Sequence, residues 1–274
     1  MYLDYWQFDS KPFEPGGDAR SLFKGAAHQA AIHKLRYAIE NGRAAGLLAG
    51  LAGTGKTLLV ETLRQQLGER YQPFVRVVFP QMTDRDLLVY LAEQLGAPPA
   101  DPPRYTIEES LRRLEFILGE NLRQDRHAVI VVDEAHLLED SGLLEPLRLL
   151  LNLGPVDKPP FTLLLVGQPT LVPMAARHGG LDERLDIKVV LSPLSADETA
   201  EYVNHRLSAA GATREIFSAD ALAVAHQLTA GIPRRLNRLC DLALLVGFAN
   251  GQHTIDADAL RSIHGELVTV AAVA

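Results

Sequence analysis

The segment GLAGTGKT, residues 50–57, combines several groups that can bind phosphate. Its glycines let backbone N–H groups approach a phosphate closely, and Lys56 can reach the β- and γ-phosphates of a nucleotide. The Thr57 hydroxyl can hold the Mg²⁺ that accompanies those phosphates. The alternative is a fortuitous glycine-rich turn. The residues expected to bind nucleotide are Gly50, Gly53, Thr54, Gly55, Lys56, Thr57 and Leu58.

The elements on either side of this segment favour a nucleotide site. The apolar run AAGLLA precedes it and predicts a strand, and TLLVETLRQQLG follows with a helical pattern that Gly68 ends. A glycine-rich loop that leads from a strand into a helix N-terminus is the context in which this pattern binds phosphate.

An acidic pair, Asp133 and Glu134, directly follows the apolar run VIVV. Ligands of open α/β sheets bind at the carboxyl ends of the strands, where Asp133 can orient the ligands of Mg²⁺. Glu134 is placed to take a proton from an attacking water. The alternative is an acidic strand end that caps the next helix. Because binding alone would not need Glu134, the pair predicts hydrolysis of the nucleotide.

Predicted strands alternate with predicted helices up to Pro193, and only helical segments and a short strand-like HTID follow. Continuous apolar strands imply a parallel sheet covered on both faces by helices. We therefore expect an α/β nucleotide-binding domain with an aromatic N-terminal strap at residues 1–192, and a small helical domain at 193–274. The predicted strands fall within residues 44–50, 73–80, 128–136, 161–169 and 186–192.

Composition limits the remaining function classes. A formal net charge of -7 argues against binding nucleic acid through a broadly basic surface, although an acidic protein can carry a local basic stripe. The single cysteine, Cys240, excludes an intramolecular disulfide and a thiolate-rich metal site. The sequence starts without a signal-peptide pattern, and no apolar stretch approaches the roughly 20 residues that span a bilayer. We therefore expect a cytoplasmic protein without a membrane span.

Two further motifs lie downstream: LLLVGQPTL at residues 163–171 and GIPRRLNRLCDLALL at residues 231–245. Together with GLAGTGKT and VVDEAH they resemble the AAA+ ATPases, and within them the ExeA-like group, named for a secretion ATPase and related to ATPases that help transposases. The N-terminal YLDYWQFDSKPF is similar to the aromatic lead-in of that group. The resemblance implies a P-loop fold with an all-α lid, ATP and Mg²⁺ as cofactors, and a homo-oligomer.

The resemblance also implies roles for two sensor residues. Gln168, after the predicted fourth strand, matches the residue that aligns the water or the γ-phosphate. The alternative is a glutamine that bonds only to backbone. Arg234 matches a second sensor that reaches from the helical domain toward the γ-phosphate, with Arg235 as the alternative one position away.

Arg184, just before the last predicted strand, matches an arginine finger supplied to the nucleotide of a neighbouring subunit. Such a finger stabilises the charge of the transition state, and in other NTPases it raises the rate by about 10³ to 10⁵. This chain departs from the usual pattern because acids surround Arg184, so a plain salt bridge is the alternative. Those acids are Asp182, Glu183 and Asp186.

For three further features, the sequence leaves two interpretations open. Either Phe8, Pro12 and Phe13 wrap the nucleotide-binding domain and approach the adenine, or the N-terminal aromatic residues form only a hydrophobic strap, made of Tyr2, Tyr5, Trp6 and Phe8. His136 either couples the nucleotide state to a neighbour or is a surface histidine at a helix start. The basic residues of RRLNR and LRRLEF either form a local patch or are solvated helix faces.

Two biological roles compete. The first is a DNA-associated ATPase that acts with a transposase-like partner, which we favour slightly because the chain consists of the ATPase core alone. The second is an assembly ATPase with secretion-system or pilus partners. A third interpretation is a nucleotide-gated interaction module in which slow hydrolysis makes ATP a switch.

Overall fold

The computed structural model describes residues 2–14, 23, 25–78, 82–99, 106–155 and 159–273, with side chains as far as residue 265. Its contacts divide the chain into two compact units. We call them the α/β unit, which comprises the described residues of 27–52 and 56–191, and the helical unit, which comprises those of 2–26, 53–55 and 192–273.

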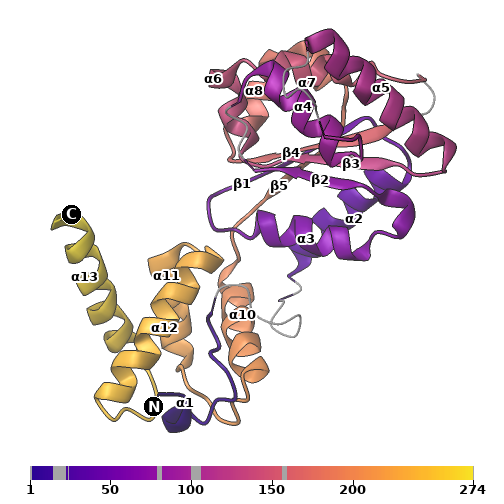
Figure 1. Ribbon diagram of the computed structural model, residues 1–274. Helices are drawn as coiled ribbons and strands as arrows, with labels where there is room; N and C mark the ends of the chain where they lie inside the picture. Colours follow the sequence, from indigo (N-terminus) through magenta and orange to yellow (C-terminus); the bar gives the residue numbers. More distant parts are fainter. Residues whose placement is uncertain are drawn as a thin grey trace. The chain divides into compact units, whose positions relative to one another are not determined.

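The α/β unit is built on a parallel five-stranded sheet in the order β2-β3-β4-β1-β5 (Figure 1). β1 pairs with β4 and β5, so that Leu47 lies opposite Leu165 on one side and Lys188 on the other. The predicted parallel sheet is therefore confirmed. The strands are β1 Ala45–Gly50, β2 Phe74–Val77, β3 Ala128–Val132, β4 Phe161–Gly167 and β5 Leu185–Leu191.

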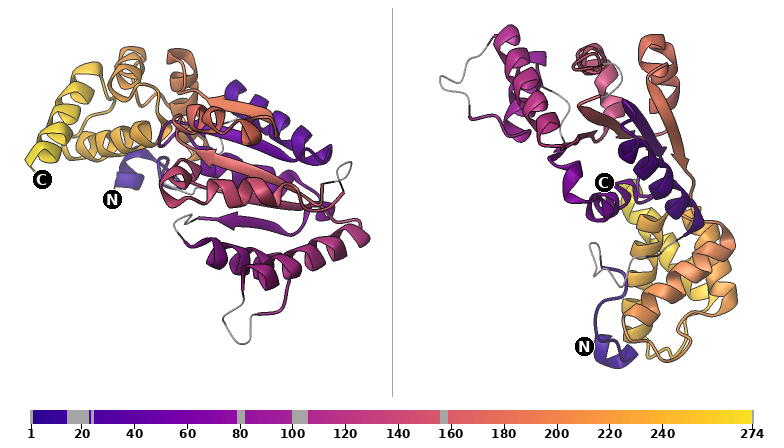
Figure 2. Two further views of the ribbon diagram at one scale, coloured as in Figure 1. Left: turned by 90° about the horizontal axis from the view of Figure 1, so that it is seen from above. Right: turned by 90° about the vertical axis from the view of Figure 1, so that its right-hand side faces the viewer.

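Helices cover both faces of this sheet, as the three views of Figures 1 and 2 show. Alternate strand residues point to opposite faces. Leu47 and Ile130 accordingly pack under α4, α5, α7 and α8, whereas Leu48 and Val131 pack against α2 and α3. These helices are α2 Ala26–Glu40, α3 Lys56–Gln66, α4 Asp84–Gln94, α5 Ile107–Arg123, α7 Leu144–Leu150 and α8 Leu171–Arg177.

Short helical turns complete the α/β unit. They are η2 Glu69–Tyr71, η3 Ala135–Leu137, α6 Leu138–Ser141 and α9 Gly179–Asp182. At the start of α5, Thr106 accepts from the backbone N–H of Glu109, and the Glu109 carboxylate accepts from the N–H of Thr106. A capping box therefore marks the start of α5.

The helical unit contains α10 Ala196–Ala209, α11 Ala219–Thr229, α12 Pro233–Ala249 and α13 Ala257–Val273. Their apolar faces share one core, to which Val203, Ala225, Leu244 and Leu260 contribute. The strand-like HTID forms only an isolated bridge from Ile255 to Phe217. Within the described part of the chain, no helix is long and apolar enough to cross a membrane.

The N-terminal segment packs in the core of the helical unit. Trp6, in α1 Tyr2–Trp6, is 1% exposed and donates its indole N–H to the carbonyl of Leu244 at 2.9 Å. Arg206 of α10 donates to the carbonyls of Pro12 and Glu14 at 2.6 and 2.9 Å. The contacts therefore group this segment with the helical unit, whereas the predicted division placed it with the nucleotide-binding domain.

The aromatic residues explain this grouping. Phe8 and Phe13 are buried in the core of the helical unit, where the ring of Phe13 meets that of Phe217 edge to face. Large aromatic side chains gain most from such burial. The packing favours the strap interpretation of these residues over an approach to adenine.

Replacing Trp6 with alanine should lower the free energy of unfolding by about 3–5 kcal/mol, the usual cost of truncating a fully buried tryptophan. Urea unfolding followed by circular dichroism would measure the loss. Leu245→Ala is the matched control because Leu245 of α12 is half exposed. An unfolding midpoint as high as that of the control would show that the strap contributes nothing to stability.

Candidate functional site

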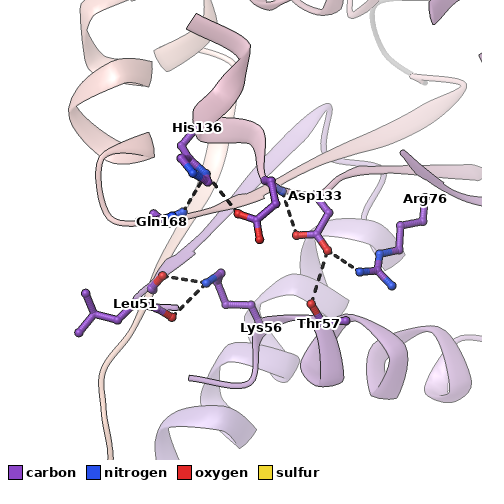
Figure 3. A network of polar contacts seen from close by, with 9 residues as sticks. Leu51, Lys56, Thr57, Arg76, Asp133, His136 and Gln168 are labelled. Carbon is purple, nitrogen blue, oxygen red and sulfur yellow. Dashed lines mark hydrogen bonds and ion pairs between the residues drawn. The ribbon is translucent and has the colours of Figure 1, made fainter. Parts of the chain in front are cut away.

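The phosphate-binding loop joins β1 to α3, as predicted. Gly53 and Gly55 have φ angles of 87° and 97°, in the region that favours glycine. Lys56, the first residue of α3, is buried and folds back over the loop. Its ammonium group donates to the carbonyls of Gly50 at 2.8 Å and Leu51 at 3.1 Å (Figure 3). The loop thus holds a buried positive charge at the carboxyl end of β1.

A hydroxyl and a carboxylate meet beside this loop. Thr57 Oγ1 lies 3.5 Å from Oδ2 of Asp133, which directly follows β3 and is 8% exposed. Oxygen donors of this kind suit Mg²⁺, which takes one or two protein ligands and completes its shell with phosphate and water. No cluster of three or more His, Cys, Asp or Glu side chains suited to a metal occurs among the described residues. The residues therefore fit an ion that arrives with a nucleotide.

Arg76 of β2 is a third residue of this cluster, in contact with Asp133, and sequence reasoning missed it. Its guanidinium donates to Asp133 Oδ2 at 2.5 Å, the same oxygen that faces Thr57 (Figure 3). β2 and β3 are neighbours in the sheet, so their carboxyl ends lie side by side. The available signal was an arginine near the end of the otherwise apolar run PFVRVVFP.

Replacing Arg76 with methionine should lower the stability of the nucleotide-free protein, because it leaves a buried carboxylate without its cation. We expect a loss of about 1–3 kcal/mol, measured by denaturant unfolding without Mg²⁺. Arg70→Met is the matched control, since Arg70 pairs with Asp125 on an exposed surface at 3.2 Å. Equal losses in the two variants would contradict a special role for Arg76 as counter-ion.

Glu134 lies beside this cluster in a restrained backbone conformation. Its φ and ψ of 50° and 35° are left-handed, which is uncommon for a side chain other than glycine. Its N–H donates to Asp133 Oδ1 at 2.9 Å, and its carbonyl accepts from Leu137 at 2.9 Å. These bonds hold the peptide while the half-exposed carboxylate stays accessible to a water molecule.

Gln168 directly follows β4 at the same edge of the sheet, and its side chain is exposed. Its backbone N lies 3.5 Å from Nδ1 of His136, which in turn lies 3.4 Å from Oε2 of Glu134. The α/β unit therefore brings Lys56, Thr57, Asp133, Glu134 and Gln168 together at the carboxyl ends of β1, β3 and β4 (Figure 3). Sequence reasoning did not link His136 to Gln168.

Arg184 lies apart from this cluster. It precedes β5, and β5 runs parallel to β1 with Leu185 beside Ala45 and Leu191 beside Gly50. Arg184 is thus at the amino end of the strands, where it donates to the Leu151 carbonyl at 3.1 Å and to the Asn152 side chain at 2.7 Å.

Two of the three acids near Arg184 in sequence pair with other cations. Asp182 contacts Lys188 at 2.5 Å, and Asp186 lies 3.8 Å from Arg43. This arrangement gives no support to the salt-bridge alternative for Arg184. Arg234 is the second residue of α12 in the helical unit and is exposed. Its role as a sensor stays a prediction.

Comparison with known proteins agrees with this geometry. A family model described as an AAA domain matches residues 39–174. General secretion pathway protein A of Aeromonas hydrophila is 34% identical over 274 residues, which cover 97% of this chain and 47% of that protein. The chain thus spans about half the length of this relative.

Two solved structures share the fold at low sequence identity. The Aeropyrum pernix ORC2 protein in its ADPNP-ADP complexes has a TM-score of 0.69 at 16% identity, covering 94% of this chain and 72% of that one. Drosophila ORC bound to DNA has a TM-score of 0.71 at 16% identity, covering 98% and 66%.

The strand order, the loop around Lys56 and the acids after β3, together with these matches, define the chain as an AAA+ ATPase of the P-loop class. The similarity to the Aeromonas protein extends over 97% of this chain and confirms the predicted resemblance to the ExeA-like group.

Proposed function

We propose that this protein binds ATP with Mg²⁺ in the loop at residues 50–58 and hydrolyses it to remodel or regulate a partner. One observation carries the proposal. The Thr57 hydroxyl and the Asp133 carboxylate lie 3.5 Å apart beside Lys56, and Glu134 is next to Asp133 in the chain. A site that only bound phosphate would need the loop but not this second carboxylate.

Each residue has a distinct task in the proposed reaction. The loop N–H groups and Lys56 bind the phosphates, and Thr57 with Asp133 would hold Mg²⁺, which neutralises charge on the β- and γ-phosphates. Glu134 takes a proton from the attacking water. Gln168 orients that water or the γ-phosphate. The other residues proposed to contact the nucleotide are Gly50, Gly53, Thr54, Gly55 and Leu58, with Arg234 as the second sensor.

We also propose that hydrolysis takes place at subunit interfaces of a homo-oligomer. Arg184 lies at the end of β5 opposite to the end that pairs with Gly50, so within the α/β unit it cannot serve its own loop. Arg184 can therefore take part in the reaction only at a nucleotide that is bound to another copy of the chain. Its exposed guanidinium is held by two neutral acceptors, and Arg184 forms no ion pair among the residues that the structure describes.

Arg184→Ala should lower the hydrolysis rate by about 10³-fold or more, with nucleotide affinity unchanged. The assay is steady-state ATPase activity beside equilibrium binding of a fluorescent ATP analogue. Arg177→Ala is the control, because Arg177 is an exposed arginine whose partner is Glu139. A variant with wild-type activity at every protein concentration would exclude a finger at this position.

An assembly ATPase of a secretion system is the biological role that we propose first. Its support is the name of the Aeromonas relative, which covers almost all of this chain. Much of that relative lies outside the matched region, so partners of its other parts carry over only as a proposal.

A DNA-associated role is the second candidate, and one surface feature favours it. Arg234, Arg235 and Arg238 are all exposed on the first turns of α12. In the other basic segment, by contrast, Arg112 pairs with Glu108 at 2.6 Å, and Arg113 donates to the carbonyl of Pro98. Of these two basic segments, the one on α12 therefore offers a phosphate backbone the more accessible charge.

The test of these proposals is ATPase activity across a range of protein concentrations, with and without double-stranded DNA, against Glu134→Gln as background. Specific activity that rises with concentration supports catalysis between subunits. A further rise with DNA that salt removes supports the DNA role, whereas indifference to DNA leaves the secretion role. Specific activity that does not depend on concentration would contradict the oligomeric mechanism.

A further inference from the structure

One imidazole nitrogen lies between the proposed general base and the end of β4. Nδ1 of His136 is 3.4 Å from Glu134 Oε2 and 3.5 Å from the backbone N of Gln168. Both contacts meet at the same ring atom in Figure 3. The two distances are nearly equal and slightly long for a hydrogen bond, so a small movement of the ring would shorten either contact to hydrogen-bond length.

The chemistry of the three groups makes these contacts mutually exclusive. An ionised carboxylate only accepts hydrogen bonds, and a backbone N–H only donates them. Nδ1 can donate to Glu134 when it carries a proton, or accept from Gln168 when it does not. It cannot do both at once.

The backbone fixes His136 in this position. The side chain is 15% exposed and lies on η3. A Cβ on Gly167 would lie 3.1 Å from the backbone N of His136 and 3.2 Å from its Nδ1. The absence of a side chain at Gly167 therefore allows the end of β4 to approach the ring closely.

We propose that His136 is a positioning residue that binds either Glu134 or the N–H of Gln168, and so couples the general base to the end of β4. The proposal rests on the proposed hydrolysis for its functional meaning. With the proton on Nδ1, the ring holds the Glu134 carboxylate. With the proton on Nε2, Nδ1 accepts from Gln168 and Glu134 is released to the water.

No net charge changes in this step. The Nδ1–H bond breaks as that proton passes to solvent, and a proton from solvent adds to Nε2, so the imidazole remains neutral. The change is one of tautomer alone. Because Gln168 directly follows β4, this change links the end of β4 directly to the holding or release of the base.

The first test uses the nucleotide-free protein and needs no hydrolysis. Imidazole ¹⁵N chemical shifts of histidine-labelled protein report which nitrogen carries the proton, and a His136→Gln spectrum identifies the signals of His136 among the nine histidines. We expect Glu134→Ala to remove the signal of the Nδ1-protonated form. An unchanged tautomer ratio would overturn the proposal.

The second test separates positioning from packing. His136→Gln keeps a donor and an acceptor, whereas His136→Phe keeps only a ring. We expect kcat to fall by about 10- to 100-fold in the phenylalanine variant, the range for groups that orient catalytic ones, with recovery in the glutamine variant and KM unchanged in both. The control is His33→Gln, an exposed residue of α2.

The two tests also separate this proposal from the proposed function. If the wild-type protein hydrolyses no ATP, the proposed function fails, and the tautomer measurement still decides whether His136 alternates between its partners. If hydrolysis occurs and both His136 variants retain the wild-type kcat, the positioning role fails while the ATPase assignment stands.

Discussion

Replacing Lys56 with alanine is expected to weaken ATP binding severely and to lower hydrolysis with it. The ammonium group is buried and directed at the two carbonyls that begin the loop. On nucleotide binding it would donate to phosphate oxygens. Hydrogen bonds to charged groups contribute about 1.5–3 kcal/mol each, so losing two of them should weaken binding by about 100-fold or more.

Equilibrium titration with a fluorescent ATP analogue would measure this loss, beside an assay of phosphate release. Lys34→Ala is the matched control because Lys34 is an exposed lysine of α2. Since Lys56 also bonds to the loop, a thermal unfolding curve must show that the variant still folds. A folded variant with wild-type affinity would mean that phosphates bind elsewhere.

The sequence predicts the elements of the α/β unit well because three of its strands, β1, β3 and β4, are short, buried, apolar runs. β3 and β4 are buried along their whole length and occur where AVIVV and FTLLLVG predict them. Thr106 and Glu109 likewise mark the start of α5 through bonds that span only one turn. Such local patterns do not depend on the rest of the fold.

Contacts between distant segments could not be predicted in the same way. The bond from Arg76 to Asp133 depends on β2 lying beside β3, and the approach of Gln168 to His136 depends on how β4 meets η3. Neither sheet order nor the path of a turn follows from composition or periodicity. The sequence therefore identified the acids and the loop but missed the residues that hold them.

The N-terminal segment shows another limit of sequence patterns. Trp6 and Phe13 clearly need a core, but nothing in YLDYWQFDSKPF specifies which of the two cores they join. Contacts with Arg206 of α10 and with α12, about 200 positions further along the chain, hold the segment in the core of the helical unit. The predicted division had grouped this segment with the nucleotide-binding domain instead.

Glu134→Gln is expected to separate binding from chemistry. Glutamine has the shape of glutamate, but its amide cannot take a proton from water, so we expect the rate of hydrolysis to fall by about 10²- to 10⁴-fold. Affinity for ATP should remain, because the groups proposed to bind phosphate and Mg²⁺ are on Lys56, Thr57 and Asp133.

Single-turnover hydrolysis and equilibrium binding would be measured on the same preparation, with Asp140→Asn, an exposed acid of α6, as the control. A variant that binds ATP and keeps it intact assigns the proton transfer to this carboxylate. Hydrolysis at the wild-type rate would mean that another group activates the water and that Glu134 is only an acidic residue after the end of β3. The comparison with Lys56→Ala is decisive, since the lysine variant should lose both binding and hydrolysis, whereas the glutamine variant should lose hydrolysis alone.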